Sequence, residues 1–311
     1  MSVILRTSVP ILLLIALGYL SRKYGILKHG DERVLSSYIY YFALPSLFFI
    51  NIYEVEFSRE IIKYVVAGIT PTFVALAIFI AIFILGIVKD KKTLYLLIVT
   101  TVFGSLAFFG IPFIVFAFGT GEPERLAALF ASTISFVSVI TATSVLELYK
   151  LHGEKNSRVK TLVKRFSKNP LIISTLLGVS INLIGFEVPI FLSTTLHSLG
   201  STTSTVAIFM LGLFFFGRSY GNLKAAFGLS LLRIVFLPLI AIIFLKFVFV
   251  VPSFESTIIV LMHGMPIAVS SIVLSERYDF FKETIASLNL ISALLSVFYL
   301  NIWLIILKTI F

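Results

Sequence analysis

The sequence predicts an all-α integral membrane protein in which ten transmembrane helices form two inverted five-helix repeats. Of the 311 residues, 59% are hydrophobic and 13% are charged, a composition too apolar for a soluble domain. Apolar runs of the ~20 residues needed to cross a bilayer follow one another along the chain. Two of these runs carry Gly-x-Pro in their middle, at 110–112 and at 264–266. We therefore expect one broken crossover helix in each half, the fourth and the ninth.

The order of apolar runs gives the individual spans. Each run is bounded by short polar stretches that serve as loops. The expected spans are about 3–21, 34–52, 61–87, 93–119, 124–149, 169–186, 189–216, 225–251, 255–275 and 282–308.

A long polar stretch at 153–168 divides the chain into a first repeat, 1–152, and a second repeat, 169–311. Because each repeat has an odd number of helices, the second must be inverted in the membrane. A shared pattern supports the division. Pro10, Gly18 and Gly25 recur 160 residues later as Pro170, Gly178 and Gly185.

Basic residues alternate between loops in the way that membrane topology requires. Loops on one side carry 18 Lys and Arg, whereas those on the other side carry three, Arg59, Lys63 and Arg125. Short loops rich in Lys and Arg stay in the cytoplasm. The sequence thus predicts a multi-pass protein of the cytoplasmic membrane, with both termini outside and the basic 153–168 linker inside. This loop pattern explains the net charge of +10 without nucleic acid, and lipid is the expected surrounding.

The two Gly-x-Pro elements are the strongest pointers to a site. A proline inside a helix removes one hydrogen bond and clashes with the carbonyl four residues back. Pro112 should thus free the carbonyl of Phe108, and Pro266 that of Met262. Freed carbonyls can bind cations, whereas the N–H groups of a restarting half-helix favour anions. Broken helices in matching positions mark the binding site of many secondary transporters, although a simple helix kink is the alternative for each.

Polar side chains near the breaks complete the candidate site. Serine hydroxyls can bind a carboxylate or a sodium ion, but they also bond back to their own helix. His263 could relay a proton, or pack as a neutral side chain. Arg233 is a candidate substrate or gating charge, with snorkelling as the alternative. The predicted substrate or ion site comprises Ser105, Phe108, Gly110, Pro112, Met262, His263, Gly264, Pro266, Ser270 and Ser271, with Arg233 as the charge.

Signals of enzymatic chemistry are missing from the sequence. The chain has no Cys, which excludes thiol catalysis, thiolate metal sites and disulfides. It has no phosphate-binding loop and no metal-ligand cluster among its four His. We expect no enzyme, no metal site and no cofactor, with Na+ or H+ as the candidate coupling ion.

Several motifs together resemble the auxin efflux carrier family of membrane transporters, in a microbial, malate-permease-like form. They are Tyr41-Phe42-Ala43-Leu44-Pro45-Ser46-Leu47-Phe48-Phe49, Gly110-Ile111-Pro112, Met265-Pro266 and Ser275-Glu276-Arg277-Tyr278. The resemblance implies a fold similar to bile acid/sodium symporters and sodium–proton antiporters. It also implies a scaffold of spans 1, 2, 6 and 7 and a transport domain of spans 3–5 and 8–10. Family substrates are organic acids such as malate and, in plants, auxin.

One departure from the family affects the expected substrate. Many members carry Asn where Ser105 and Ser270 stand when the sequences are aligned on the crossover prolines. Serine keeps a hydroxyl but loses the reach and the second donor of the amide. An auxin carrier is therefore not expected.

Together these observations predict a secondary active transporter that moves a small organic anion, a carboxylate, by alternating access. A homodimer through the scaffold helices fits this expectation. The alternatives are a sodium-coupled symporter or sodium–proton antiporter on the same fold, and a ligand-binding membrane sensor. Replacing Pro112 or Pro266 by Ala should abolish transport.

Overall fold

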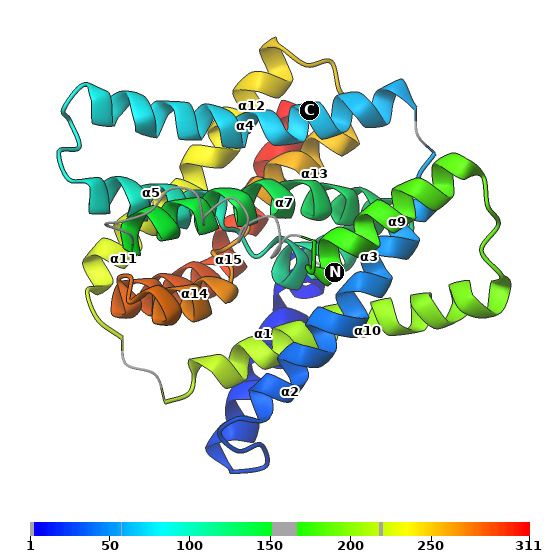
Figure 1. Ribbon diagram of the computed structural model, residues 1–311, viewed down its shortest axis with the longest axis horizontal. Coiled ribbons are helices and arrows are strands. Elements are labelled where there is room, and N and C mark those ends of the chain that lie inside the picture. Colours follow the sequence, from blue (N-terminus) through cyan, green and yellow to red (C-terminus); the bar gives the residue numbers. More distant parts are fainter. Residues whose placement is uncertain (1–2, 57, 151–166, 218–219) are drawn as a thin grey trace. The chain divides into compact units, whose positions relative to one another are not determined.

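The computed structural model describes residues 3–56, 58–150, 167–217 and 220–311. Nearly all of the predicted basic linker at 153–168 lies outside these residues. Within them, every regular element is helical, apart from one antiparallel bridge between Gly104 and Ile267. The all-α prediction is therefore confirmed for this part of the chain (Figure 1).

Helices occupy the positions at which the spans were expected, and the label η marks π-helical turns. In chain order they are α1 (Val3–Lys23), α2 (Asp31–Tyr38), η1 (Ile39–Ala43), α3 (Leu44–Tyr53), α4 (Arg59–Ile84), α5 (Lys91–Val102), η2 (Leu106–Gly110), α6 (Ile111–Phe118), α7 (Glu122–Lys150), α9 (Pro170–Ile184), α10 (Ile190–Phe215), α11 (Leu223–Leu231), η3 (Leu232–Phe236), α12 (Leu237–Phe247), α13 (Ser253–His263), α14 (Ser270–Tyr278) and α15 (Lys282–Ile310).

Among the described residues, six helical stretches are long and apolar enough to cross a membrane. Apolar surface of this extent agrees with an integral membrane protein, while the ten-span inverted repeat stays a prediction. The six stretches are Asp31–Tyr53, Arg59–Ile84, Glu122–Tyr149, Ile190–Phe215, Leu223–Phe247 and Lys282–Ile310.

Three helices begin at a side chain that caps their first turn. Ser58, Asp90 and Asn169 each accept a hydrogen bond from a backbone N–H group in the helix that follows. Such caps satisfy donors that lack a partner inside the helix. At Asp90, hydrogen bonds from the N–H groups of Lys92 and Thr93 hold the pKa of the carboxyl below its usual range.

Each of the three π-helical turns ends two residues before a proline, namely Pro45, Pro112 and Pro238. The wider turn gives room to the proline ring, which would otherwise clash with the carbonyl four residues back. At Pro238 that carbonyl belongs to Ile234, and it accepts a hydrogen bond of 2.8 Å from Trp303 Nε1. The prolines are thus accommodated without interrupting the helices.

The chain divides into two compact units, and each draws segments from both halves of the sequence. Unit 1 comprises Met1–Phe57, Ala107–Ser132 and Lys155–Arg218, and unit 2 comprises Ser58–Leu106, Thr133–Glu154 and Ser219–Phe311.

Unit 1 is built on close contacts between helix backbones. α1 packs along α10, and a Cβ atom added at Gly18 would collide with the carbonyl oxygen of Phe209. A Cβ atom at Gly212 would collide in the same way with the carbonyl oxygen of Ile15. Small residues at such crossings let membrane helices approach closely, so these glycines fix the packing of unit 1.

Unit 2 packs α12 against α4 and α13, and α11 against α15. Buried Ala226, Ile267 and Leu288 form an apolar cluster that joins α11, the stretch before α14 and α15. The chain breaks before η2 and before α14 lie within this unit, which therefore holds most of the candidate site.

Candidate functional site

The break in the fourth predicted span lies earlier than the sequence indicates. α5 ends at Val102, and helical structure resumes at Leu106 and continues past Gly110 and Pro112 to Phe118. The chain is non-helical at 103–105, not at the Gly-x-Pro element. The physical reason is that the π turn of η2 accommodates Pro112, so this proline does not end the helix.

The break in the ninth predicted span lies at its Gly-x-Pro element. α13 ends at His263, and α14 begins at Ser270, so that Gly264 and Pro266 lie between the two helices. The carbonyl of Met262, which we expected to be freed by Pro266, accepts a hydrogen bond of 3.3 Å from the N–H of Met265. Hydrogen bonds from outside this break reach the carbonyls of the later residues Gly264, Met265 and Pro266.

The two breaks run antiparallel to each other inside unit 2. The N–H of Ser105 donates to the carbonyl of Pro266 at 2.7 Å, and the N–H of Ala268 donates to the carbonyl of Phe103 at 2.8 Å. These bonds flank the bridge between Gly104 and Ile267. Backbone without helical bonds is tolerated at membrane depth only when it is satisfied by protein or lines a cavity. Here, backbone N–H and carbonyl groups of the two breaks bind one another.

Arg233 ties both breaks to a third segment. Its Nε donates to the carbonyl of Met265 at 2.7 Å, and its Nη1 donates to the carbonyl of Thr101 at 2.6 Å. The side chain comes from η3 and is 3% exposed. Arg233 therefore does not snorkel to a membrane surface, because its charged end is bound inside the unit.

Further side chains bind the remaining carbonyls of the breaks. The Tyr299 hydroxyl donates to the carbonyl of Gly264 at 2.7 Å, and the Ser138 hydroxyl donates to the carbonyl of Val102 at 2.6 Å. Each carbonyl from residues 101–103 and 264–266 consequently accepts at least one hydrogen bond from the protein. This arrangement offers few oxygens to a bound cation.

His263 precedes the second break, and Ser270 and Ser271 follow it. His263 is buried, and its Nε2 donates to the carbonyl of Gly68 on α4 at 2.9 Å. Ser271 is buried, and its hydroxyl accepts a hydrogen bond of 3.0 Å from Asn289. Ser270 opens α14 and is partly exposed. Of the predicted residues in this unit, Ser105 and Pro266 thus make direct contact with each other.

Phe108, Gly110 and Pro112 belong to unit 1, in η2 and α6. Gly110 is the residue before α6, and Pro112 lies in its first turn and is buried. Pro is well suited to the first turn, where no intrahelical N–H is needed. Their predicted role in binding stays a prediction.

The sequence analysis missed polar residues on α15 that reach the ninth-span break. Tyr299 and Ser292 contact it, Ser292 by accepting a 3.3 Å hydrogen bond from the N–H of Ile267, and Asn289 donates to Ser271 in the first turn of α14. Their spacing was a usable signal, because residues three and four apart lie on one face of a helix. Asn289, Ser292, Ser296, Tyr299 and Trp303 follow this spacing and are all buried.

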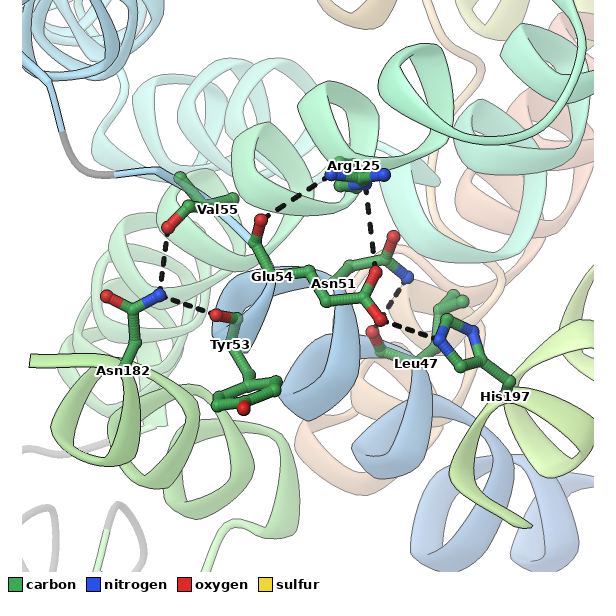
Figure 2. Close-up of polar contacts among 8 residues, drawn as sticks. All are labelled: Leu47, Asn51, Tyr53, Glu54, Val55, Arg125, Asn182 and His197. Carbon is green, nitrogen blue, oxygen red and sulfur yellow. Dashed lines mark hydrogen bonds and ion pairs between the residues drawn. The ribbon is translucent and has the colours of Figure 1, made fainter. Parts of the chain in front are cut away.

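A second polar cluster lies in unit 1, where Glu54 lies beside the side chains of His197 and Arg125 (Figure 2). His197 Nε2 lies 2.7 Å from one Glu54 carboxylate oxygen, and Arg125 Nε lies 3.8 Å from the other. Asn182 donates to the carbonyls of Tyr53 and Val55. The cluster borders an open cavity of 670 Å³. Its charged side chains are paired and partly exposed. We therefore assign the cluster a structural role, in which it links α3, α7, α9 and α10.

Comparison with known proteins relates nearly the whole chain to transporters. A family model described as a membrane transport protein matches residues 3–304. An uncharacterized transporter of Methanocaldococcus jannaschii is 26% identical over 94% of this chain and 95% of its own length. A protein of Rhizobium meliloti named "Putative malonate transporter" is 24% identical over 93% and 91%. The uncharacterized transporter YfdV of Escherichia coli is 24% identical over 88% of each chain.

Proposed function

Because this chain belongs to the membrane transport protein family, that of the auxin efflux carriers, we propose that it is a secondary active transporter of a small organic anion. It is a multi-pass membrane transporter and not an enzyme. The proposed substrate is a carboxylate, and the proposed mechanism is alternating access across the cytoplasmic membrane.

The observation that carries the proposal is the pair of antiparallel chain breaks held by Arg233. Paired breaks of transmembrane helices form the substrate site in other secondary transporters. A buried arginine beside them supplies positive charge, whereas the carbonyls that could bind sodium already accept hydrogen bonds. These contacts favour an anion over a cation as the main occupant. The malonate in the name of the Rhizobium relative supports a carboxylate.

The two compact units support the proposal that one part of the chain is a scaffold and the other moves with the substrate. Unit 1 contains α1, α2, α3, α9 and α10, which correspond to spans 1, 2, 6 and 7. Unit 2 contains both chain breaks and the buried polar contacts around them. We propose that unit 1 is the scaffold, through which a homodimer would form, and that unit 2 carries the substrate, with both termini outside.

Reconstitution into liposomes tests the proposal directly. Currents are recorded on rapid exposure to mono- and dicarboxylates, with and without sodium and a pH step. We expect a response to a carboxylate that is lost in Pro266→Ala, because a new N–H and a more helical break would disturb the hydrogen bond from Ser105 to the carbonyl of residue 266. Pro170→Ala is the matched control, since Pro170 merely opens α9. Direct uptake of labelled malonate covers electroneutral exchange.

Two outcomes would contradict the proposal. A response to sodium or pH alone, with no carboxylate uptake, would indicate a sodium–proton antiporter. Normal carboxylate transport by both Pro112→Ala and Pro266→Ala would contradict the part of the proposal that places the substrate at the two breaks.

A further inference from the structure

We propose that the guanidinium of Arg233 is the carboxylate-binding group of this transporter, with Nη2 as the donor that meets the substrate. This inference rests on the proposed function and adds the residue, the atom and the charge requirement. The guanidinium lies in unit 2. Nε and Nη1 each bind a carbonyl, while Nη2 is buried and has no hydrogen-bond partner among the described residues.

An unpartnered N–H group in this position needs an explanation. A buried donor without an acceptor costs ~1–3 kcal/mol, and more when the group is charged. Arginine has five N–H donors in a rigid fork that matches the two oxygens of a carboxylate. The carbonyls of Thr101 and Met265 orient the fork and leave Nη2 without an acceptor among the described residues. A carboxylate at that corner would complete the donor set.

The charge of Arg233 also lacks a counter-ion among the described residues. None of the ion pairs found there includes Arg233. The ionisable side chains that interact with it are Tyr299 and His263, and neither is a carboxylate. A buried cation is stabilised chiefly by pairing. An anionic substrate would supply the negative charge that the described part of the protein does not.

The residues around the Arg233 guanidinium leave space for this side chain and offer a second polar group. A Cβ atom at Gly104 would collide with the guanidinium of Arg233, its Nη2 atom first, so glycine leaves room for the fork beside the bridge. Thr101, whose carbonyl holds Nη1, has a fully buried hydroxyl that also lacks a described partner. A hydroxyl donates readily to a carboxylate oxygen. Thr101 is therefore the second residue that we assign to the substrate.

Ligand-dependent protection against unfolding separates binding from folding. The purified protein in detergent, in chloride-free buffer, is heated with malonate or with malonamide, its uncharged amide analogue. We expect malonate to raise the unfolding temperature of the wild type and malonamide to leave it unchanged. Arg233→Gln should reduce the apparent malonate affinity about tenfold or more, because a charge-assisted hydrogen bond is lost. Arg233→Lys, which keeps the charge without the fork, should fall between the two.

Two matched controls remove the effects of general perturbation. Lys246→Gln deletes a positive charge from the same predicted span, at an exposed position. Gly228→Ala adds a methyl group on α11 where nothing lies within 4 Å. Both should bind malonate as the wild type does. Gly104→Ala should displace the guanidinium, and it should weaken malonate binding although the charge is retained.

The outcomes distinguish the inference from the proposed function. If Arg233→Gln unfolds at a lower temperature but gains the same protection from malonate, Arg233 is only a structural tie and the inference is overturned. If Arg233→Gln does not fold, unchanged affinity in both Arg233→Lys and Gly104→Ala overturns it instead. If wild-type liposomes transport no carboxylate, the proposed function fails as well. Transport by wild type with an unchanged KM in the Arg233 variants refutes the inference alone.

Discussion

Arg125 in unit 1 and Arg233 in unit 2 show how differently the two units use a positive charge. The Arg125 side chain is 42% exposed and lies beside the Glu54 carboxylate, with its Nε 3.8 Å from that group. Arg233 is 3% exposed and binds only backbone carbonyls. An exposed pair contributes little to stability, whereas a buried charge must be held by many contacts. Unit 1 thus places a positive charge beside a carboxylate at a partly exposed position, whereas unit 2 buries one against backbone carbonyls, as the proposed anion site requires.

The two units also differ in how their helices are held together. Unit 1 brings helix backbones together at Gly18 and Gly212. Unit 2 instead surrounds two interrupted helices with hydrogen bonds from Arg233, Tyr299 and Ser138. Close packing of regular helices resists deformation. These contacts agree with the proposed scaffold role of unit 1 and with the proposed binding role of unit 2.

Removal of the buried arginine should have the largest effect on stability. Arg233→Gln leaves the carbonyls of Met265 and Thr101 without their donors, and we expect a loss of about 4 kcal/mol. Arg125→Gln should cost about a quarter of that or less. Denaturant unfolding in one detergent, followed by tryptophan fluorescence, measures both. Equal losses in the two variants would end the distinction between the arginines.

A methyl group at the α1–α10 crossing should rank second. Gly18→Ala places Cβ against the Phe209 carbonyl, where only a backbone shift can relieve the clash, so we expect a loss of about 3 kcal/mol. Gly228→Ala, with open space around it, should change stability by less than about 1 kcal/mol. The same unfolding assay compares them. A tolerated Gly18→Ala would mean that unit 1 is not held by this contact.

Loss of a single hydroxyl at the ninth-span break should have an intermediate effect. Tyr299→Phe leaves the carbonyl of Gly264 without its donor, and we expect a loss of about 2 kcal/mol. Tyr24→Phe removes a hydroxyl from a 70% exposed residue and serves as the control. Thermal unfolding at one scan rate reports the difference. Identical melting of the two variants would show that Tyr299 contributes nothing to the break.

The smallest effect is expected from the exposed cluster of unit 1. Arg125→Gln should lower stability by less than about 1 kcal/mol, and the loss should shrink as salt is added, because exposed charges are screened. The Arg233→Gln loss should respond much less to salt, since its contacts are buried. Unfolding at low and at high ionic strength provides the measurement. A salt-independent Arg125 effect would point to a packing role for its side chain.

Much of the helical arrangement could be predicted from the sequence, because apolar length is a strong signal. The apolar runs coincide with helices, and Gly264 and Pro266 lie in a chain break. The first break was misplaced, because proline alone does not reveal whether a π turn accommodates it, as at Pro112. The break at 103–105 has a subtler signal in Gly104, whose need for space depends on Arg233. That contact joins residues 129 positions apart in the sequence.

Some candidate site residues could be predicted and others could not, because several roles depend on partners that are distant in the sequence. Arg233 was identified as a charge inside an apolar segment, and Ser105 as a hydroxyl near the predicted fourth-span break, at a position where many family members carry Asn. Tyr299 and Ser138 were missed because each looks ordinary within its own helix, and their roles arise only from partners that are distant in the sequence. Polar residues repeating on one face of α15 were the available clue.

The close contact between α1 and α10 at Gly18 and Gly212 provides a reference distance within the protein. Two helices pressed together at their backbones keep a constant separation while other parts of a transporter move. The chain has no Cys, so pairs of cysteines can be introduced for spectroscopic labels without first removing native thiols. A pair on α1 and α10 should report one unchanging distance through the transport cycle, and it gives a reference against which any second pair can be read.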